Sequence, residues 1–424
     1  MKFLILANND DDGAGQTAIN LSNNLKKLNH QVKVNILYSR TKDTNIKIIE
    51  RSFLLRIFSF LLNFLKIKKI NDFKKNFLEL FWFGNTTIKF SSIKKEIEES
   101  DVIIIFTFNR IISKNIFEKI MRYKKVIFLR PLDTEFATGG CHFNGDCQNY
   151  TESCNKCPKL NFLNFFNITK KNLITKKQIV EKYKPKVLVP NTYVKKIFEK
   201  SSIFKESEML IARLDVRNER KNFYAKEKAR EILGLNKEEN IILFGTFNLS
   251  SHLKGGHLLI NALKLLETKY LEQDQKKKLL RETRVLTVGN KNNFEFKSDI
   301  IKWSHLGVIN SDKHLNLLYR ASDLLVSPTI QCFGPHMLSE AVANKLPVIS
   351  FDVGAAQDDI KHGENGFLVP CYDISVFTKY MYQILYDESV REKIFLSTKN
   401  FESGRLEDEA TSIANYSKKF IKEL

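Results

Sequence analysis

Four cysteines in the first half of the chain are the first residues whose spacing suggests chemistry. Cys141, Cys147, Cys154 and Cys157 follow the spacing C-x5-C-x6-C-x2-C, which places four thiols within seventeen residues. The N-terminus has a short apolar run and then three aspartates, a pattern typical of a first strand and not of a secretory signal. We therefore expect a reducing compartment, in which a structural zinc site with tetrahedral geometry is favoured over disulfides.

A second candidate site lies in the stretch from residue 319 to residue 369. Two short apolar runs, 324–326 and 347–349, are bounded by turn residues, which predicts two buried parallel strands. A helix is predicted between them, over about residues 337–344, directly after Phe333-Gly334-Pro335. Such a unit points backbone N–H groups and a positive helix end at the space beyond the strand. We expect a phosphorylated ligand there.

The motifs of this stretch resemble the donor site of glycosyltransferase family 4, whose members have the GT-B architecture. The matching pieces, in order, are Phe333-Gly334, Glu340-Ala341-Val342-Ala343, Pro347-Val348-Ile349, Asp352-Val353-Gly354 and Gly363-Glu364-Asn365-Gly366-Phe367-Leu368-Val369. The resemblance implies that Glu340 binds the ribose of a nucleotide and that backbone near Gly334 and Gly354 contacts the donor diphosphate. An ordinary carboxylate at a helix start is the alternative for Glu340.

The sequence departs from the family pattern at two positions. The first glutamate of the family's E-x7-E pair is absent, and Cys332 stands eight residues before Glu340. The family also holds the diphosphate with an arginine and a lysine; Lys254 matches the lysine, whereas His252 or Asn248 would be a poorer substitute for the arginine. A solvated lysine at a helix start is the alternative for Lys254.

The first strand, predicted over residues 3–7, leads into a loop with two close glycines and then a helix to about residue 28. Closely spaced glycines at such a turn allow backbone to approach a ligand. The resemblance implies that this loop faces the cleft between two domains and that Gly13 and Ala14 contact the donor. A plain tight turn is the alternative interpretation.

Asp133 follows a strand predicted over residues 125–130. The run Thr138-Gly139-Gly140-Cys141-His142-Phe143, continued by Cys147, Cys154, Cys157 and Pro158, resembles a subgroup of family 4 that builds bacterial surface polysaccharides of the colanic acid, O-antigen and capsule type. In that subgroup an aspartate at the position of Asp133 faces the cleft. Such a carboxylate orients an acceptor hydroxyl or acts as its base; the alternative is that it caps a helix or loop.

The segment from residue 51 to residue 83 is unusually apolar. Between residues 53 and 67 the polar residues Arg56, Ser59, Asn63 and Lys66 form one narrow helical stripe, and the run is too short and too polar to span a bilayer. Together with Trp82 and the lysines named at the end of this paragraph, this apolar run predicts an interfacial anchor on anionic lipid. A helix buried in the protein core is the alternative. The lysines are Lys66, Lys68, Lys69, Lys74 and Lys75.

Length and composition indicate the number and the class of the domains. The chain has 424 residues, of which 43% are hydrophobic and 27% charged, enough for two globular domains. A net charge of +20 attracts polyanions, but no nucleic-acid-binding motif is present and we expect no nucleic-acid partner. Alternating strands and helices predict an α/β fold of two doubly wound, Rossmann-like domains facing a cleft. We expect an acceptor-side domain over 1–205, with the helix 406–424 packing back on it, and a donor domain over 206–405.

Taken together, the resemblance implies a retaining glycosyltransferase, an enzyme of the hexosyltransferase class. It would move a sugar from a UDP- or GDP-sugar to a lipid-linked or growing glycan, and would need no cofactor for transfer. We expect a cytoplasmic protein, peripheral at the inner face of the plasma membrane. Two alternatives stay open: a sugar-nucleotide epimerase of GT-B fold, and a catalytically inactive, membrane-attached partner subunit.

Overall fold

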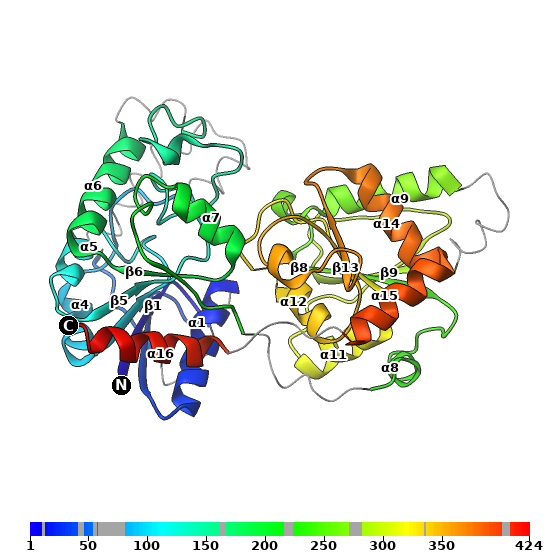
Figure 1. The fold of residues 1–424 in the computed structure, drawn as a ribbon, viewed down its shortest axis with the longest axis horizontal. Helices are drawn as coiled ribbons and strands as arrows, with labels where there is room; N and C mark the ends of the chain where they lie inside the picture. The colour runs from blue at the N-terminus through cyan, green and yellow to red at the C-terminus, as the bar shows by residue number, and fades with distance from the viewer. Residues whose placement is uncertain are drawn as a thin grey trace. The chain divides into compact units, whose positions relative to one another are not determined.

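A computed structural model divides the chain into two compact units (Figure 1). Unit 1 comprises Met1–Asp215 and Arg405–Leu424, and unit 2 comprises Val216–Gly404. The structure describes residues 1–10, 13–40, 46–53, 57, 81–160, 167–215, 224–270, 282–334, 336–400 and 408–424. In each unit a parallel sheet is covered by helices.

The sheet of unit 1 has the strand order β3-β2-β1-β4-β5-β6-β7 in the described part of the chain, and all its pairs are parallel. Every residue of β4 and of β5 is buried, because helices cover both faces of the sheet and leave no polar side for alternation. The strands are β1 (Lys2–Ala7), β2 (Gln31–Ile36), β3 (Ile46–Ile48), β4 (Val102–Ile105), β5 (Val126–Leu129), β6 (Lys186–Val189) and β7 (Met209–Ile211).

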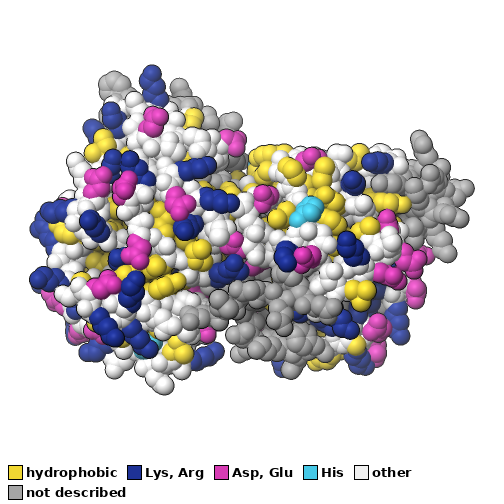
Figure 2. Space-filling model, in the orientation of Figure 1, with side chains coloured by type: hydrophobic (Ala, Val, Ile, Leu, Met, Phe, Trp, Pro, Cys, Tyr) yellow, Lys and Arg dark blue, Asp and Glu magenta, His cyan; other side chains and the backbone are white. Residues whose placement is uncertain are grey.

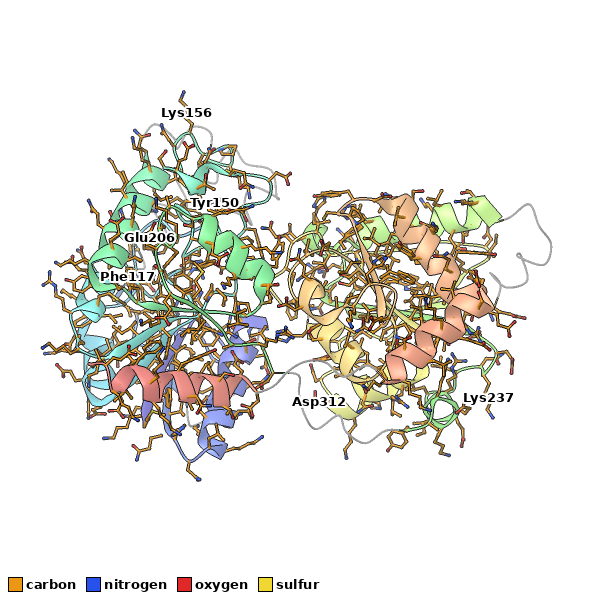
Figure 3. All side chains as sticks on the ribbon, in the orientation of Figure 1. Phe117, Tyr150, Lys156, Glu206, Lys237 and Asp312 are labelled. Carbon is orange, nitrogen blue, oxygen red and sulfur yellow. The ribbon has the colours of Figure 1, made fainter. Side chains whose placement is uncertain are left out.

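Side-chain caps fix where several helices of unit 1 begin. Ser113 accepts a hydrogen bond from the N–H of Ile116 at the start of α5, and Asn191 accepts one from Val194 at the start of α7. Side chains such as Phe117 of α5 point from these helices into the core (Figure 3). The helices are α1 (Gly13–Lys27), α4 (Ser91–Glu99), α5 (Lys114–Met121), η1 (Asn149–Thr151), α6 (Ile168–Tyr183), α7 (Thr192–Lys200) and α16 (Glu409–Ile421).

The C-terminal helix α16 belongs to unit 1 (Figure 1), and a buried ion pair attaches it to the rest of the unit. Arg130, directly after β5, donates through Nε to Oε1 of Glu409 at 2.9 Å and through its other nitrogens to the carbonyls of Leu188 and Ala212. Burial raises the pKa of Glu409 to about 7, although the positive charge of Arg130 acts in the opposite direction. The guanidinium therefore joins three strands' ends to one helix that is far away in sequence.

The sheet of unit 2 has the order β10-β9-β8-β11-β12-β13 in the described part of the chain, again with parallel pairs only. From β8 the chain builds outward to β10 on one side, and from β11 to β13 on the other. The boundary between β8 and β11 is therefore the topological switch point, beside which ligands of such sheets bind. The strands are β8 (Asn240–Asn248), β9 (Thr283–Asn290), β10 (Lys302–His305), β11 (Leu324–Ser327), β12 (Val348–Phe351) and β13 (Gly366–Val369).

Unit 2 has a hydrophobic core on each face of its sheet. Ile242 and Phe244 of β8 pack on one side, and Ile241 and Leu243 of the same strand pack on the other. This explains why the strand reads as a continuous apolar run, because both of its faces are buried. The helices are α8 (Lys226–Ile232), η4 (His252–Lys254), α9 (Gly256–Tyr270), α11 (Asp312–Ala321), α12 (His336–Ala343), α13 (Ala356–Asp359), α14 (Ile374–Tyr386) and α15 (Glu388–Asn400).

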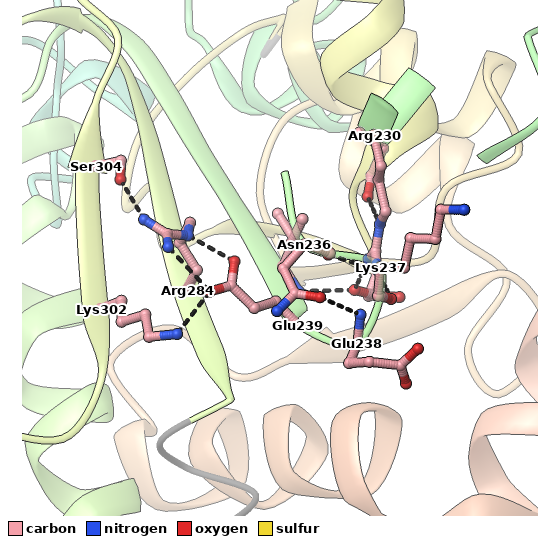
Figure 4. A network of polar contacts seen from close by, with 11 residues as sticks. Arg230, Asn236, Lys237, Glu238, Glu239, Arg284, Lys302 and Ser304 are labelled. Carbon is pink, nitrogen blue, oxygen red and sulfur yellow. Dashed lines mark hydrogen bonds and ion pairs between the residues drawn. The ribbon is translucent and has the colours of Figure 1, made fainter. Parts of the chain in front are cut away.

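Polar contacts hold the amino ends of three strands of unit 2 together (Figure 4). Arg284 of β9 makes a bidentate pair with Glu239, at 2.7 and 2.9 Å, and donates to the hydroxyl of Ser304 in β10. Lys302 donates to the same carboxylate at 2.7 Å. Hydrogen bonds from Arg284 and Lys302 lower the pKa of Glu239, against the opposing effect of its burial. The carboxylate therefore stays charged and links adjacent strands.

Within the described residues, no helix is long and apolar enough to cross a membrane. Most of the segment predicted as an interfacial anchor lies outside the described residues. Its end is described: Trp82 is fully buried and its indole N–H donates to the carbonyl of Ile112 at 2.8 Å. Trp82 therefore belongs to the core of unit 1, and its inclusion in a membrane-facing surface was wrong.

Candidate functional site

The predicted donor residues follow three neighbouring strands of unit 2. Lys254 follows β8, Gly334 follows β11 and Gly354 follows β12. Because β8, β11 and β12 are adjacent and parallel, their carboxyl ends meet at one edge of the sheet, next to the switch point. The fold thus brings to one edge three loops that are far apart in the sequence.

The loops after β8 and β11 touch directly. Gly255 has a left-handed backbone with φ of 71°, and a Cβ there would lie 1.8 Å from the carbonyl oxygen of Pro328, so only glycine permits this approach. The N–H of Ile330 donates to the carbonyl of Leu253 at 3.0 Å. These contacts fix the position of Lys254, the residue between Leu253 and Gly255.

The ammonium of Lys254 contacts the residue that replaces the family's first glutamate. Its Nζ donates to Sγ of Cys332 at 3.2 Å, and Cys332 is buried. The two candidates to replace the missing arginine are both engaged nearby: the ring of His252 stacks on that of His257 at 4.4 Å, and Oδ1 of Asn248 accepts from Ser250 and Asn292. Among the described residues of this loop, Lys254 is the cation best placed for a diphosphate.

Glu340 is a buried carboxylate on α12. It is 7% exposed, and its Oε2 accepts a hydrogen bond of 2.5 Å from the hydroxyl of Tyr319 on α11. The helix begins at His336, so Glu340 is its fifth residue and does not lie in the first turn, where the alternative interpretation placed it. A buried charge is costly unless it has partners, and Tyr319 is one that the sequence analysis did not identify.

The remaining predicted donor residues are also placed at turns. Gly354 has φ of 59° between β12 and α13, a conformation that favours glycine. In unit 1, Gly13 and Ala14 are exposed at the first turn of α1, and a Cβ added at Gly13 would meet no atom within 4 Å. The first turn of α1 is therefore exposed at these two residues.

Asp133 lies in a polar cluster of unit 1 rather than alone. Its Oδ2 is 2.8 Å from Nδ1 of His142, and its Oδ1 accepts the N–H of Glu135 at 2.6 Å. Asp133 is 6% exposed, whereas the side chain of His142 is 29% exposed. The pair therefore presents an imidazole to the outside, oriented by a buried carboxylate. The sequence contained His142 within the quoted motif, but its partnership with Asp133 was not predicted.

Two further ionisable groups lie beneath this pair, and neither was predicted. Glu135 is fully buried and accepts the N–H of Phe108 at 2.7 Å; burial and the neighbouring Asp133 raise its pKa to about 8. Lys176 of α6 is also buried, donates to the carbonyl of Glu135 at 2.6 Å, and has its pKa lowered to about 8 by burial. Glu135 and Lys176 therefore form the buried polar surroundings of Asp133.

The only group among the described residues that could hold a metal ion is Asp133, Glu135 and His142, whose ligand atoms lie within 4.8 Å of one another. The ammonium of Lys176 beside Glu135 opposes a second positive charge there. The four cysteines form no such group, whereas sulfurs that bind one zinc ion at about 2.3 Å are about 3.8 Å apart. Among the described residues these sulfurs are therefore not gathered at zinc-binding distances, and the structural zinc site expected from their spacing is not shown.

Hydrogen bonds and packing describe the surroundings of three of the cysteines. Cys141 and Cys157 are buried with Phe81, and the thiol of Cys141 donates to Cys157, which lowers the pKa of Cys157 and raises that of Cys141. Sγ of Cys154 accepts the N–H of Gly139 at 3.2 Å. The outer end of this loop is exposed, with Lys156 pointing away from the unit (Figure 3). Packing and backbone hydrogen bonds account for three of the four thiols.

Comparisons with known proteins agree with this geometry. Residues 225–400 match the family model described as "Glycosyl transferases group 1". Comparison with curated protein sequences gave no match. Among solved structures, sucrose-phosphate synthase from Thermosynechococcus elongatus is similar with a TM-score of 0.66 at 15% identity, covering 100% of both chains.

Two further solved structures have the same arrangement. Anabaena Alr3699/HepE in complex with UDP-glucose has a TM-score of 0.64 at 13% identity, covering 100% of both chains. WaaG, a glycosyltransferase involved in lipopolysaccharide biosynthesis, has a TM-score of 0.60 at 12% identity, covering 98% of both chains. The predicted α/β fold of GT-B type is confirmed, and residues 225–400 are similar to the group 1 glycosyltransferases.

Proposed function

We propose that the chain is a retaining glycosyltransferase that uses a nucleotide-diphosphate sugar as donor. The observation that carries the proposal is the convergence of Lys254, Glu340 and the loops of Gly334 and Gly354 around the switch point of unit 2. A cation, a buried carboxylate and two turns with backbone N–H groups are the partners that a diphosphate and a ribose require. The alternatives, a solvated lysine for Lys254 and an ordinary carboxylate at a helix start for Glu340, do not require the two residues to lie at the same edge of the sheet.

Each donor residue has a distinct task in this proposal. The ammonium of Lys254 stabilises negative charge on the departing diphosphate, as does the N-terminal end of α12 near Gly334. The carboxylate of Glu340 accepts hydrogen bonds from ribose hydroxyls, and Tyr319 holds it in place. Gly354 lets the loop after β12 approach the ligand closely. The assignment of Gly13 and Ala14 to the donor rests on the family resemblance of their loop.

On the acceptor side, we assign Asp133 and His142 to the acceptor hydroxyl. Asp133 orients His142 through the 2.8 Å contact with Nδ1, and the imidazole is the more exposed member of the pair. In this proposal the more exposed imidazole of His142 binds the hydroxyl or receives its proton. In this proposal Asp133 is a positioning residue for His142 and not itself the base.

The acceptor in this proposal is a lipid-linked or growing glycan of a surface polysaccharide, and the protein acts peripherally at the inner face of the plasma membrane. WaaG, one of the similar structures, is named as an enzyme of lipopolysaccharide biosynthesis. The net charge of +20 favours association with anionic lipid. On the face drawn in Figure 2, basic side chains are interspersed with acidic ones, so this face offers no single basic patch.

A donor panel tests the proposal. The purified chain is incubated with UDP- and GDP-sugars, with and without a lipid-linked acceptor, and free nucleotide and glycan product are measured. We expect nucleotide release that depends on acceptor and that Lys254→Gln slows. Lys393→Gln, a change of an exposed lysine on α15, is the matched control.

The same experiment separates the alternatives. An epimerase would convert the donor sugar without extending the acceptor. An inactive partner subunit would bind a nucleotide sugar but produce no free nucleotide, whichever donor and acceptor were present. Either result would overturn the proposed transfer.

A further inference from the structure

Two arginines of unit 1 converge on one phenol oxygen. Arg51 donates through Nη1 to the hydroxyl of Tyr38 at 2.7 Å, and its guanidinium carbon lies over the Tyr38 ring, 4.3 Å from the centroid. Arg110 donates to the same oxygen at 3.4 Å. Both contacts are at the surface, where Tyr38 is 37% exposed, so a ligand can reach them from solvent. We call Arg51 and Arg110 the arginine pair.

The partner of the arginine pair is unusual for this chain. Arg130, for comparison, forms an ion pair with the carboxylate of Glu409. Within the described part of the chain, neither Arg51 nor Arg110 forms an ion pair with a carboxylate, and a neutral phenol takes that place. Two like charges held at one oxygen repel each other, and an anion bound beside both would offset this repulsion.

Three loops at one edge of the sheet carry these side chains. Tyr38 follows β2, Arg51 follows β3 and Arg110 follows β4. The strands are parallel in the order β3-β2-β1-β4, so their carboxyl ends meet at the same edge. The direction in which the sheet grows changes between β1 and β4, which makes this boundary the switch point of unit 1. The contact between Arg110 and Tyr38 therefore crosses the place where doubly wound sheets bind ligands.

The segment 86–88 fixes the backbone of both arginines. Thr87 donates through its N–H and through Oγ1 to the carbonyl of Arg110, at 2.8 and 3.0 Å. These bonds hold Arg110 at φ of 64°, a left-handed conformation that is unfavourable for a residue other than glycine. Arg51 forms an antiparallel bridge with Ile88. Both side chains therefore start from a backbone that the same short segment positions.

The loop of Arg110 is also bonded to the loop proposed for the acceptor hydroxyl. The N–H of Phe108 donates to Oε1 of Glu135 at 2.7 Å, and the N–H of Glu135 donates to Oδ1 of Asp133 at 2.6 Å. Asp133 in turn contacts His142. Since β4 and β5 are neighbours, the arginine pair and the Asp133–His142 pair belong to adjoining loops at one edge of the sheet.

We propose that Arg51, Arg110 and Tyr38 bind a phosphate group of the acceptor. Two guanidiniums match the charge of a phosphate monoester, about two negative charges at neutral pH, and their planar forks suit its oxygens. The phenol oxygen accepts from both guanidiniums, so it offers the ligand its own proton. That the phosphate belongs to an acceptor rests on the proposed function, whereas the binding of phosphate by the arginine pair does not.

Titration calorimetry on the full chain tests the site, with glucose 6-phosphate, inorganic phosphate and uncharged glucose as probes. We expect both phosphates to bind and glucose not to bind. The double change Arg51→Gln with Arg110→Gln should weaken glucose 6-phosphate at least about tenfold, as loss of charged hydrogen bonds should. The matched control is Arg122→Gln with Lys124→Gln, which removes the same charge from exposed positions at the end of α5. Thermal melting shows whether each variant is folded.

Two further measurements locate the site and identify the source of the phosphate. Lys254→Gln, in the donor loop, should leave glucose 6-phosphate binding unchanged. Sedimentation with vesicles of phosphatidylcholine and phosphatidylglycerol should be equal for the two double variants, because both lose the same net charge. In the transfer assay with a lipid-linked acceptor, the double change of the arginine pair should raise KM for the acceptor at least about tenfold and leave UDP affinity unchanged.

Absence of glucose 6-phosphate binding at millimolar concentration would overturn the inference, as would equal binding by the wild type and by the double variant of the arginine pair. Binding lost in Lys254→Gln but kept in that double variant would assign the phosphate to the donor loop instead. Loss of vesicle binding confined to that double variant, without sugar-phosphate binding, would assign the pair to lipid headgroups and overturn the acceptor site. If glucose 6-phosphate binds at the arginine pair but no donor gives transfer, the proposed function fails and the phosphate site stands.

Discussion

Replacement of Glu340 by glutamine tests the donor site most directly, because it keeps the shape of the side chain and removes its charge. The carboxylate is 7% exposed and its Oε2 is held by Tyr319 at 2.5 Å, so it is positioned before a nucleotide binds. A hydrogen bond from a ribose hydroxyl to a carboxylate contributes about 1.5–3 kcal/mol. We therefore expect Glu340→Gln to weaken UDP binding about 10- to 150-fold.

Tyr319→Phe is the matched control for this change. It removes the hydroxyl that holds Glu340 but leaves the charge that the ribose requires. We expect a smaller loss of affinity, about 0.5–1.5 kcal/mol, the range of an ordinary hydrogen bond. Because the two side chains are in contact, the double variant should lose less affinity than the two single variants together.

Calorimetry with UDP and with GDP gives the affinities, and thermal melting reports whether each variant keeps its fold. The reasoning would be refuted if Glu340→Gln bound both nucleotides as the wild type does and melted at the same temperature. It would also be refuted if Tyr319→Phe lost as much affinity as Glu340→Gln, since the charge would then be irrelevant to the ligand.

Four other changes test separate parts of the structure. Gly255→Ala should lower the free energy of unfolding in urea by at least about 2 kcal/mol, because it combines a left-handed backbone with a steric clash; Gly234→Ala, with a similar φ but open space, should cost only about 1 kcal/mol. Folding raises the pKa of Glu409 from about 4.5 to about 7, so its contribution to the free energy of unfolding is full below pH 4.5 and is lost as the pH rises through 7. Glu409→Gln should remove this pH-dependent loss of stability. Parallel urea-stability profiles for the variant and the wild type between pH 5 and 8 would contradict the prediction. Asp133→Asn should reduce acceptor-dependent transfer about 100-fold or more and leave UDP affinity unchanged; equal loss of UDP affinity would place it elsewhere. Cys147→Ser should alter neither the melting temperature nor the zinc content by elemental analysis, because its thiol belongs to no group of converging ligands.

The local pattern of apolar and turn residues was sufficient to predict most strands. The runs 324–326 and 347–349 became β11 and β12, and 3–7 became β1, because strands covered on both faces are predominantly apolar. The helix predicted over about 337–344 is α12, His336–Ala343. Motif order was also sufficient to place the GT-B fold, since turns with glycine at left-handed positions recur at fixed points between these elements.

The same local pattern misled where a residue's surroundings were distant in sequence. Trp82 belonged to an apolar segment with trailing lysines, yet the carbonyl of Ile112 binds its indole in the core. The spacing of the cysteines predicted one zinc site, which is not shown: Sγ of Cys154 accepts the N–H of Gly139, and Cys147 joins no group of ligand atoms among the described residues. Spacing limits how far apart side chains are, but the backbone of the loop decides where they point.

What the sequence alone determined is therefore the set of elements and the chemical types available at their ends. Only the tertiary structure decided which of these types meet. The strand order places β8 beside β11, which brings Lys254 to Cys332, and the packing of α11 on the sheet brings Tyr319 to Glu340. The physical reason is that periodicity encodes which face of an element is buried, whereas contacts between elements depend on the order and register in which the strands pair.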